Sequence, residues 1–397
     1  MNTPQLGQHL LNRTKGDRII WGVVIVLSLL SLMAVYSSTG SLAYRLHKGH
    51  TEVYLIKQLG VLAAGIAIIY AAHRVNYTIY SNIAVLLFAI SIPLLMYTLF
   101  FGTTLNEGSR WIRLPLVGIT FQTSDLAKLG LFMFLARQLS RMQRDLTNFK
   151  KVAIHIFLPV IVICGLIAMA NLSTALMIAM SCGVLFFIGR IQISHLLILG
   201  ASAIFLFGVL FTVSKLTGFG RAATWEKRIQ NFKSKDKKDV PFQVLQGKIA
   251  IAKGKWVGVG PGNSSQRNFL PHPYSDFIFA IIIEEYGLLP GGLGLIFLYL
   301  LFLWRSIIIF RRCPFAFGAF LAVGLSFTLV FQAFLNMAVN VNLVPVTGLT
   351  LPLVSMGGSS IWFTCLAIGI ILSVSRFVEE AEGDQVGDGL ISDEQED

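Results

Sequence analysis

Charged residues are scarce in this chain, and acidic residues are rare outside its last segment. Only 13% of the 397 residues are charged, about half the share typical of a soluble domain, whereas 55% are hydrophobic. Nine of the 20 acidic residues fall within the last 21 positions, which contain no Lys or Arg. This composition argues against an ordinary soluble protein and predicts one that crosses a membrane several times.

Cysteine is also scarce, and its placement argues against a disulfide framework. The four cysteines lie within or at the ends of apolar runs, and none forms a CxxC pair: Cys164, Cys182, Cys313 and Cys365. We interpret them as small buried apolar side chains rather than metal ligands. The net charge of +12 does not indicate nucleic acid as a partner. The basic residues lie mainly in loops between apolar runs, where membrane topology and anionic lipid headgroups account for them.

Ten apolar runs approach the roughly 20 residues that a helix needs to cross a bilayer. They lie at about 19–39, 54–72, 81–101, 123–139, 152–170, 172–189, 193–213, 276–303, 314–335 and 351–375. We therefore predict an all-α integral membrane protein with ten transmembrane helices. Residues 1–18 form a cytoplasmic segment, 19–376 the membrane domain, and 377–397 an acidic cytoplasmic tail that we expect to be disordered.

The basic residues of the short loops predict the orientation. With a cytoplasmic N-terminus, fourteen Lys and Arg residues lie inside and four lie in the short outer loops, so both termini are expected to be cytoplasmic. The long loop at 214–275, between the seventh and eighth segments, is then extracytoplasmic. Asp276 follows this loop and faces outward.

Three carboxylates mark the segment after the long loop. Asp276 stands at its mouth, and Glu284 and Glu285 lie within it. A charge at the bilayer centre costs roughly 2.5 to 3.5 kcal/mol on insertion scales, so these acids require a structural or chemical reason. On a continuous helix the glutamates would lie roughly 12 Å below Asp276. We expect one glutamate to join Asp125 and Lys128, which share a helical face, in a structural ion-pair network, and Asp276 to be either the reacting group or a helix N-cap.

Several motifs, in the same order along the chain, resemble the SEDS family of peptidoglycan glycosyltransferases. They are GSRWI (108–112), QTSDLAK (122–128), LSTALM (172–177), WEKRIQNF (225–232), the 246–267 loop, SDFIFAIIIEEYG (275–287) and TGLTLPLVSMGGSS (347–360). The resemblance spans most of 19–376. The last motif is more similar to the FtsW branch, which acts in division, than to the RodA branch, which acts in elongation.

The resemblance implies polymerisation of lipid II into β-1,4 glycan strands on the outer face of the bacterial cytoplasmic membrane. In this single inverting displacement Asp276 would take the acceptor hydroxyl proton, or would bind a divalent cation such as Mg²⁺ or Mn²⁺. The diphosphate leaving group needs positive charge rather than a general acid. Residues expected to contact the substrate are Arg110, Lys128, Lys248, Gln266, Arg267 and Ser355.

The sequence departs from the family pattern in places. Ala170 and Asn171 stand where the family commonly has a Pro-Asp pair, so any role of that carboxylate is absent here. Tyr274 and Ser275 replace a His-Thr pair, and Met356 replaces a tyrosine. The positions of Asp276, Lys128, Arg110 and the two glutamates are retained.

Two readings from other classes stay open at this point. A lipid II flippase would also need charged groups within the membrane, and a non-catalytic scaffold would only recruit other proteins. An elongation polymerase of the RodA type is the alternative within the family. The resemblance also implies partners, namely a class B penicillin-binding protein with transpeptidase activity and other division proteins.

Overall fold

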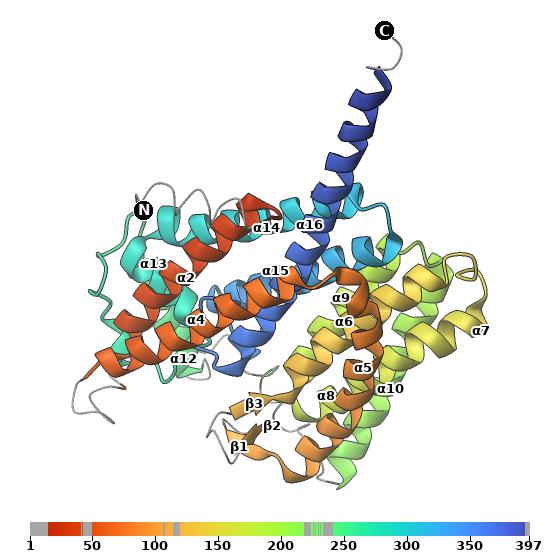
Figure 1. Cartoon of the computed structure of the whole chain (residues 1–397). Coiled ribbons are helices and arrows are strands. Elements are labelled where there is room, and N and C mark those ends of the chain that lie inside the picture. Colours follow the sequence, from red (N-terminus) through yellow and green to blue (C-terminus); the bar gives the residue numbers. More distant parts are fainter. Residues whose placement is uncertain are drawn as a thin grey trace.

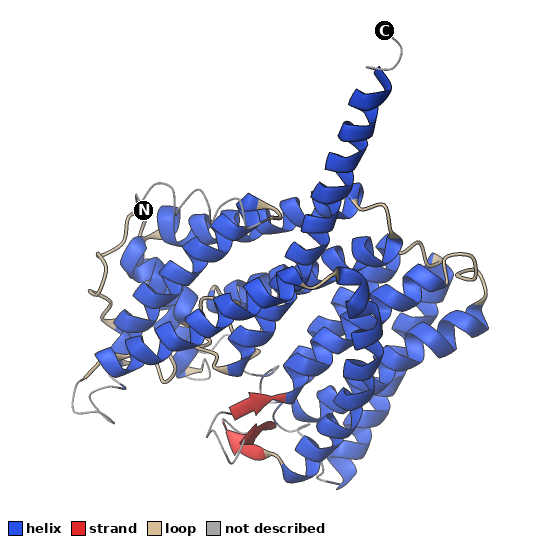
Figure 2. Cartoon of the chain, in the orientation of Figure 1, coloured by secondary structure: helices blue, strands red, loops and turns tan. Residues whose placement is uncertain are grey.

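The computed structural model describes residues 15–40, 42, 50–105, 108–113, 120–217, 224, 226, 228, 230, 232 and 241–393. It is almost entirely helical (Figure 2). The first half contains α2 (Arg18–Ser38), α4 (Glu52–Arg74), α5 (Tyr77–Phe101), α6 (Thr123–Arg141), α7 (Phe149–Val152), the π-helical η1 (Ala153–Phe157), α8 (Leu158–Ala170), α9 (Leu172–Ile188) and α10 (Ile193–Thr217). The second half contains α12 (Phe242–Gly254), η2 (Gln266–Asn268), α13 (Ile278–Tyr286), the π-helical η3 (Leu288–Leu293), α14 (Gly294–Arg312), α15 (Ala316–Asn340) and α16 (Ser359–Asp393).

Eight helical stretches of the described chain are long and apolar enough to cross a membrane. The two other expected segments are also helical, but α9 has only 17 residues and α6 carries several charged side chains. The multi-pass helical architecture is therefore confirmed, while the count of ten spans and the sidedness stay predictions. The long apolar helices follow from hydropathy, since a helix satisfies its own backbone hydrogen bonds inside a bilayer.

The two C-terminal spans form the centre of the bundle. In α15 and α16, 78% and 72% of the most apolar stretch is buried inside the protein. The corresponding stretch of α10 is 0% buried, and this helix stands at the outer edge of the bundle (Figure 1). Consequently α15 can contribute to an internal site, whereas most of α10 faces the surroundings.

The segment expected at 276–303 is not one helix. It forms α13 and then the continuous η3 and α14, and Gly287, whose φ of +84° lies in the left-handed region, separates α13 from η3. A Cβ at this position would lie 2.4 Å from the Trp256 carbonyl oxygen, so the backbone of 256–258 can approach only a glycine here. The acids at the end of α13 therefore lie before this break, and the span that follows it begins at Leu288.

Two further differences concern chain segments outside the spans. A three-stranded antiparallel sheet, not expected from the sequence, joins α5 to α6 through β1 (Thr103–Leu105), β2 (Gly108–Arg113) and β3 (Thr120–Gln122), in that order. The tail beyond 376, expected to be disordered, continues α16 as a helix to Asp393 and projects from the bundle (Figure 1). Its first turns are held by Glu379, which accepts from the Gly16 N–H at 2.8 Å, and by Glu380, which pairs with Lys15 at 3.1 Å.

Candidate active site around Asp276

Asp276 lies in the turn before α13, half-buried, where its neighbours fix its orientation. The Ser275 hydroxyl donates to Oδ1 of Asp276 at 2.9 Å. On the other side lies Gly348, where an added Cβ would be 3.6 Å from Oδ2 of Asp276. This carboxylate is thus bordered by the loop between α15 and α16.

The backbone of Asp276 is held by two buried asparagines on α15. Asn336 and Asn340 each donate from Nδ2 to the Asp276 carbonyl oxygen at 3.0 Å. Asn336 also donates to the Leu349 carbonyl at 2.7 Å, and Asn340 accepts from the Ala280 N–H at 3.2 Å. Both side chains are almost fully buried, so they fix Asp276, the start of α13 and the 349 region relative to α15.

Ser355 was expected to contact substrate, but its side chain instead bonds to backbone groups of two segments. Its hydroxyl donates to the Ser275 carbonyl at 2.7 Å and accepts from the Leu351 N–H at 2.8 Å, and the side chain is buried. The next residue, Met356, donates its N–H to the Tyr274 carbonyl at 2.9 Å. These bonds hold the TGLTLPLVS segment against the turn that carries Asp276.

Tyr274 adds a neutral polar group to this turn. Burial, followed by the influence of Tyr54 and Asp276, raises the pKa of its phenol. The phenol therefore stays protonated at neutral pH. Its hydroxyl lies 3.3 Å from Nδ1 of His272.

Lys128 and Asp125 form a buried pair on α6, with 3.4 Å between Nζ and Oδ1. Lys128 also donates to Oε1 of Gln332 at 2.8 Å, and Gln332 donates in turn to the Thr350 carbonyl at 2.9 Å. The pair is thereby linked through an uncharged amide to the loop that borders Asp276. Oδ2 of Asp125 is buried without a hydrogen-bond partner among the described residues.

The expectation that a glutamate joins the Asp125–Lys128 pair is wrong. Helix α13 ends at Tyr286, and both glutamates point to the glycine-rich loop at 255–267. Glu284, fully buried, accepts from the Ser265 and Gln266 N–H groups at 3.1 and 3.3 Å and from the Ser264 hydroxyl. The partners of Glu285 are the Ser37 hydroxyl and, at 3.4 Å, the Ser264 N–H.

Two of the remaining predicted contacts, Gln266 and Arg267, lie on this loop. Gln266 is buried, and Arg267 donates to the Ser37 carbonyl and hydroxyl, both at 3.1 Å. Lys248 is exposed on α12. Arg110 lies on β2, but its side chain is outside the described part of the chain. The predicted contacts are therefore not all brought to one point.

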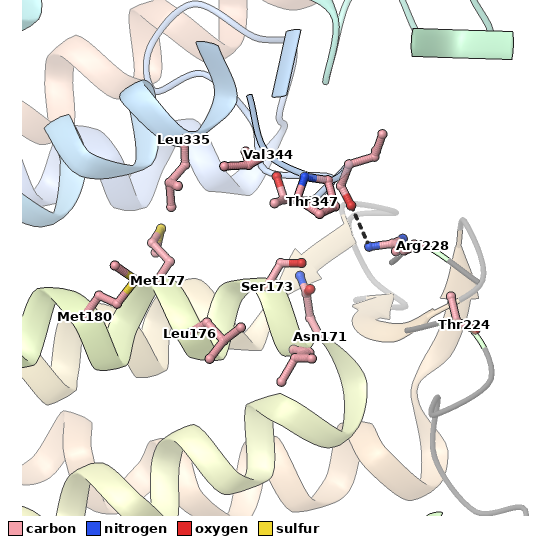
Figure 3. A pocket seen from close by; sticks show the side chains of 13 residues that line it. Asn171, Ser173, Leu176, Met177, Met180, Thr224, Arg228, Leu335, Val344 and Thr347 are labelled. Atoms are coloured by element: carbon pink, nitrogen blue, oxygen red, sulfur yellow. Dashed lines mark hydrogen bonds between the residues drawn. The ribbon is translucent and has the colours of Figure 1, made fainter. Parts of the chain in front are cut away.

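A groove lies between α9 and α15, beside residues 344–347 of the loop that follows α15. Its cavity volume is about 260 Å³, and it is lined by Asn171, Leu172, Ser173, Leu176, Met177, Met180, Thr224, Arg228, Leu335, Val344, Pro345, Val346 and Thr347. We call this the α9–α15 groove. Figure 3 shows polar groups of Asn171, Ser173, Arg228 and Thr347 toward one end and Met177, Met180 and Leu335 toward the other. Thr347 directly precedes Gly348, and Leu335 directly precedes Asn336, so the groove and the Asp276 site use neighbouring residues of the same two segments.

Sequence reasoning missed the amides of α15 and the groove. Gln332, Asn336 and Asn340 recur at every fourth residue, which puts three amides on one helix face over about 12 Å. This spacing was visible in the sequence and could have identified them. The groove offers no such signal, because its walls come from three distant parts of the chain.

Residues 17–380 match the family model of FtsW, RodA and SpoVE, described as a cell cycle protein. Stage V sporulation protein E of Bacillus subtilis (strain 168) is 32% identical over 375 residues, which cover 92% of this chain and 98% of that protein. A probable peptidoglycan glycosyltransferase FtsW from Coxiella burnetii (strain RSA 493 / Nine Mile phase I) is 32% identical over 372 residues, covering 90% and 96%.

Solved structures agree in fold. Rod shape determining protein RodA of Thermus thermophilus matches with a TM-score of 0.66 and 24% identity, over 91% of this chain and 97% of that one. A chain from a study of "structural coordination of polymerization and crosslinking by a peptidoglycan synthase complex" matches with a TM-score of 0.67 and 25% identity, over 91% and 98%. The present chain therefore belongs to the FtsW, RodA and SpoVE family and is a multi-pass membrane glycosyltransferase.

Proposed function

We propose that this protein polymerises lipid II into β-1,4 glycan strands at the outer face of the bacterial cytoplasmic membrane. The observation that carries the proposal is Asp276, a half-buried carboxylate whose backbone is fixed by two buried asparagines. Relatives named peptidoglycan glycosyltransferase FtsW support the substrate class.

The proposed reaction is one inverting displacement at the anomeric carbon of the donor sugar. The carboxylate of Asp276 accepts the proton of the acceptor hydroxyl. At the same time the oxygen of that hydroxyl bonds to the anomeric carbon. The bond from carbon to the diphosphate oxygen breaks, and undecaprenyl diphosphate leaves with the electron pair. We assign Arg110 and Lys128 to stabilise the negative charge of the diphosphate.

A divalent cation is a further proposal for this site. The described residues contain no cluster of three His, Cys, Asp or Glu side chains that could hold a metal ion. Mg²⁺ is commonly bound by one or two carboxylates together with substrate phosphates and water, and Asp276 can supply one such ligand. Any cation here would therefore depend on the substrate for its affinity.

We further propose that the protein acts in cell division together with a class B penicillin-binding protein. The solved complex that coordinates polymerization and crosslinking contains a chain of the same fold, which supports a transpeptidase partner. The several relatives named FtsW favour the division branch over the elongation branch. Depletion of the gene tests the branch, since loss of a division polymerase gives filaments and loss of an elongation polymerase gives rounded cells.

The catalytic proposal is tested with purified full-length protein, lipid II and Mg²⁺ or Mn²⁺, with and without the candidate transpeptidase. We expect glycan polymer on a gel from the wild-type protein and none from Asp276→Asn. Asp145→Asn is the matched control, because Asp145 is an exposed acid paired with Lys151 at 2.8 Å. Normal turnover by Asp276→Asn would refute the assignment, and movement of labelled lipid across vesicles without polymer would favour a flippase.

A further inference from the structure

A small cavity lies between α6, α15 and α16, which pack against one another. Four polar side chains line it together with apolar ones, and they are only 2% to 8% exposed: Asp125, Lys128, Thr328 and Thr364. We call this the α6–α16 cavity. Its volume is about 10 Å³, and roughly 10 to 15 Å³ is enough to hold one water molecule. Any occupant is therefore no larger than a water molecule or a small ion.

The ion pair in this cavity has one acceptor and one donor to spare. Oδ2 of Asp125 is buried without a hydrogen-bond partner among the described residues. The ammonium group of a lysine carries three N–H groups. In the described part of the chain, Lys128 faces two acceptors, Oδ1 of Asp125 at 3.4 Å and Oε1 of Gln332 at 2.8 Å. One molecule that accepts from Lys128 and donates to Asp125 satisfies both groups.

The two threonines supply a third partner. The Thr328 hydroxyl donates to the Gly324 carbonyl at 2.8 Å, and the Thr364 hydroxyl donates to the Ser360 carbonyl at 3.0 Å. A hydroxyl that donates in this way keeps acceptor capacity on its oxygen. Buried waters typically make about three hydrogen bonds, and the pair together with a threonine oxygen provides that number. The polar lining therefore matches the hydrogen-bonding capacity of water.

A second cavity of the same volume, about 10 Å³, provides a comparison within the same protein. Val24, Leu27 and Phe302 are among its mostly apolar lining residues, and we call it the apolar cavity. None of its lining residues has a buried polar side-chain atom that lacks a hydrogen-bond partner within the described ranges. The hydroxyl of Tyr299, which lines it, donates to the Pro352 carbonyl at 2.6 Å. Apolar cavities stay dry, so this one is expected to hold no water.

We propose that one water molecule occupies the α6–α16 cavity, where it accepts from Lys128 and donates to Oδ2 of Asp125 and to a threonine hydroxyl oxygen. A buried ion pair loses its hydration, and this loss is offset only when further hydrogen bonds satisfy its remaining groups. The water also holds Lys128 in reach of Gln332, whose amide donates to the Thr350 carbonyl at 2.9 Å. A cation fits less well, because the Lys128 ammonium already places positive charge beside the cavity.

The test uses hydroxyl radicals that an X-ray pulse forms from water bound inside the full-length protein, with modified side chains identified by mass spectrometry. Phe132 and Leu325 line the α6–α16 cavity and are 1% and 3% exposed, so bulk water does not reach them. Phe302 and Leu27 line the apolar cavity and are 4% and 2% exposed. We expect the first two side chains to be labelled about ten times faster than the second two. Equal rates would overturn the inference.

A double variant removes the groups that hold the water. Asp125→Leu combined with Lys128→Met replaces the pair by apolar side chains of similar size, a change that buried ion pairs often tolerate. We expect labelling of Phe132 to fall to the rate of Phe302, while thermal unfolding verifies that the variant is folded. Labelling of Phe132 at the wild-type rate would contradict the assignment.

Thr328→Val is a milder variant that keeps the pair and the shape of the side chain. It removes one hydroxyl oxygen from the cavity, so we expect slower labelling of Phe132 than in the wild-type protein. Thr212→Val is the matched control, because the Thr212 hydroxyl also donates to the carbonyl four residues earlier at 2.8 Å but lies on α10, away from the cavity lining. An equal change in both variants would show that the loss of a threonine, rather than of a water partner, is measured.

Exchange of the salt separates water from a bound cation. With sodium replaced by N-methylglucamine, we expect the same labelling of Phe132 and the same melting temperature. A melting temperature that rises with sodium in the wild-type protein but not in Thr328→Val would identify a cation and refute the water. None of these measurements requires turnover, so the water site and the proposed function can fail separately.

Discussion

The two ends of α13 hold carboxylates in opposite ways. Before its first residue, Asp276 is half-buried, and two asparagine amides fix it through its backbone carbonyl. At its last turn, Glu284 is fully buried, and its carboxylate accepts N–H and O–H groups of the 264–266 loop. A carboxylate surrounded by such donors stabilises a fold, whereas one that is held by its backbone and reaches a partly exposed position can exchange a proton with a substrate.

The largest stability effect is expected from Glu284→Ala. This change would leave the Ser265 and Gln266 N–H groups and the Ser264 hydroxyl without their carboxylate, at a cost of about 3 kcal/mol or more. Thermal unfolding of the purified protein should show a clearly lower melting temperature. Glu52→Ala, at an exposed acid, is the control. An unchanged melting temperature would mean that the glutamates are not structural.

Asn340→Leu, on α15, tests how Asp276 is held at the start of α13. Leucine has a similar size but cannot donate to the Asp276 carbonyl, and a small displacement of a reacting group can lower a rate about 100-fold. We expect kcat to fall by about that factor with little change in KM, since the substrate pocket stays intact. Ser326→Ala on α15 is the control, because its hydroxyl donates to the Val323 carbonyl of the same helix at 3.2 Å. A fall in melting temperature without a change in kcat would identify a purely structural role.

Gly348→Ala should have a smaller effect on both properties. Its φ of +68° costs a residue with a Cβ roughly 1 to 2 kcal/mol, and the added Cβ would lie 3.6 Å from Oδ2 of Asp276, an ordinary contact. We expect a modest loss of stability and a decrease in polymerisation smaller than that of Asn340→Leu. Gly183→Ala, in α9 with no atom within 4 Å of the added Cβ, controls for the substitution. A null effect on activity would show that Asp276 tolerates a crowded neighbour.

The smallest effect is expected from Lys253→Gln. Its Nζ lies 3.9 Å from Oε1 of Glu284, but the lysine is 46% exposed, and such pairs contribute about 1 kcal/mol or less. Chemical or thermal unfolding should therefore barely differ from the wild-type protein. A large loss would show that a cation, rather than the N–H and O–H donors, holds the buried glutamate.

The features that could be predicted from the sequence are those that depend on local interactions. Hydropathy indicated the helical membrane bundle, and spacing indicated that Asp125 and Lys128 lie on one helix face, where they are 3.4 Å apart. The position of Asp276 next to an apolar helix was also visible. These features depend on neighbouring residues and on the helix period.

The rest depends on contacts between distant segments. No hydropathy pattern shows that the helix stops at Gly287, because the break requires the backbone of 256–258 to pack against it. Glu284 accepts from two backbone N–H groups 18 and 19 residues earlier, and Asn340 bonds to a carbonyl 64 residues away. A backbone group has no residue-specific sequence signal, so such partners are found only in the structure.

The most direct test compares Asp276→Asn with Glu284→Ala in the same two assays, polymerisation of lipid II and thermal unfolding. We predict that Asp276→Asn forms no polymer and melts as the wild-type protein does, while Glu284→Ala melts at a lower temperature. Polymer from Asp276→Asn, or equal melting of Glu284→Ala and the wild-type protein, would contradict the division of these carboxylates into a reacting group and a structural one.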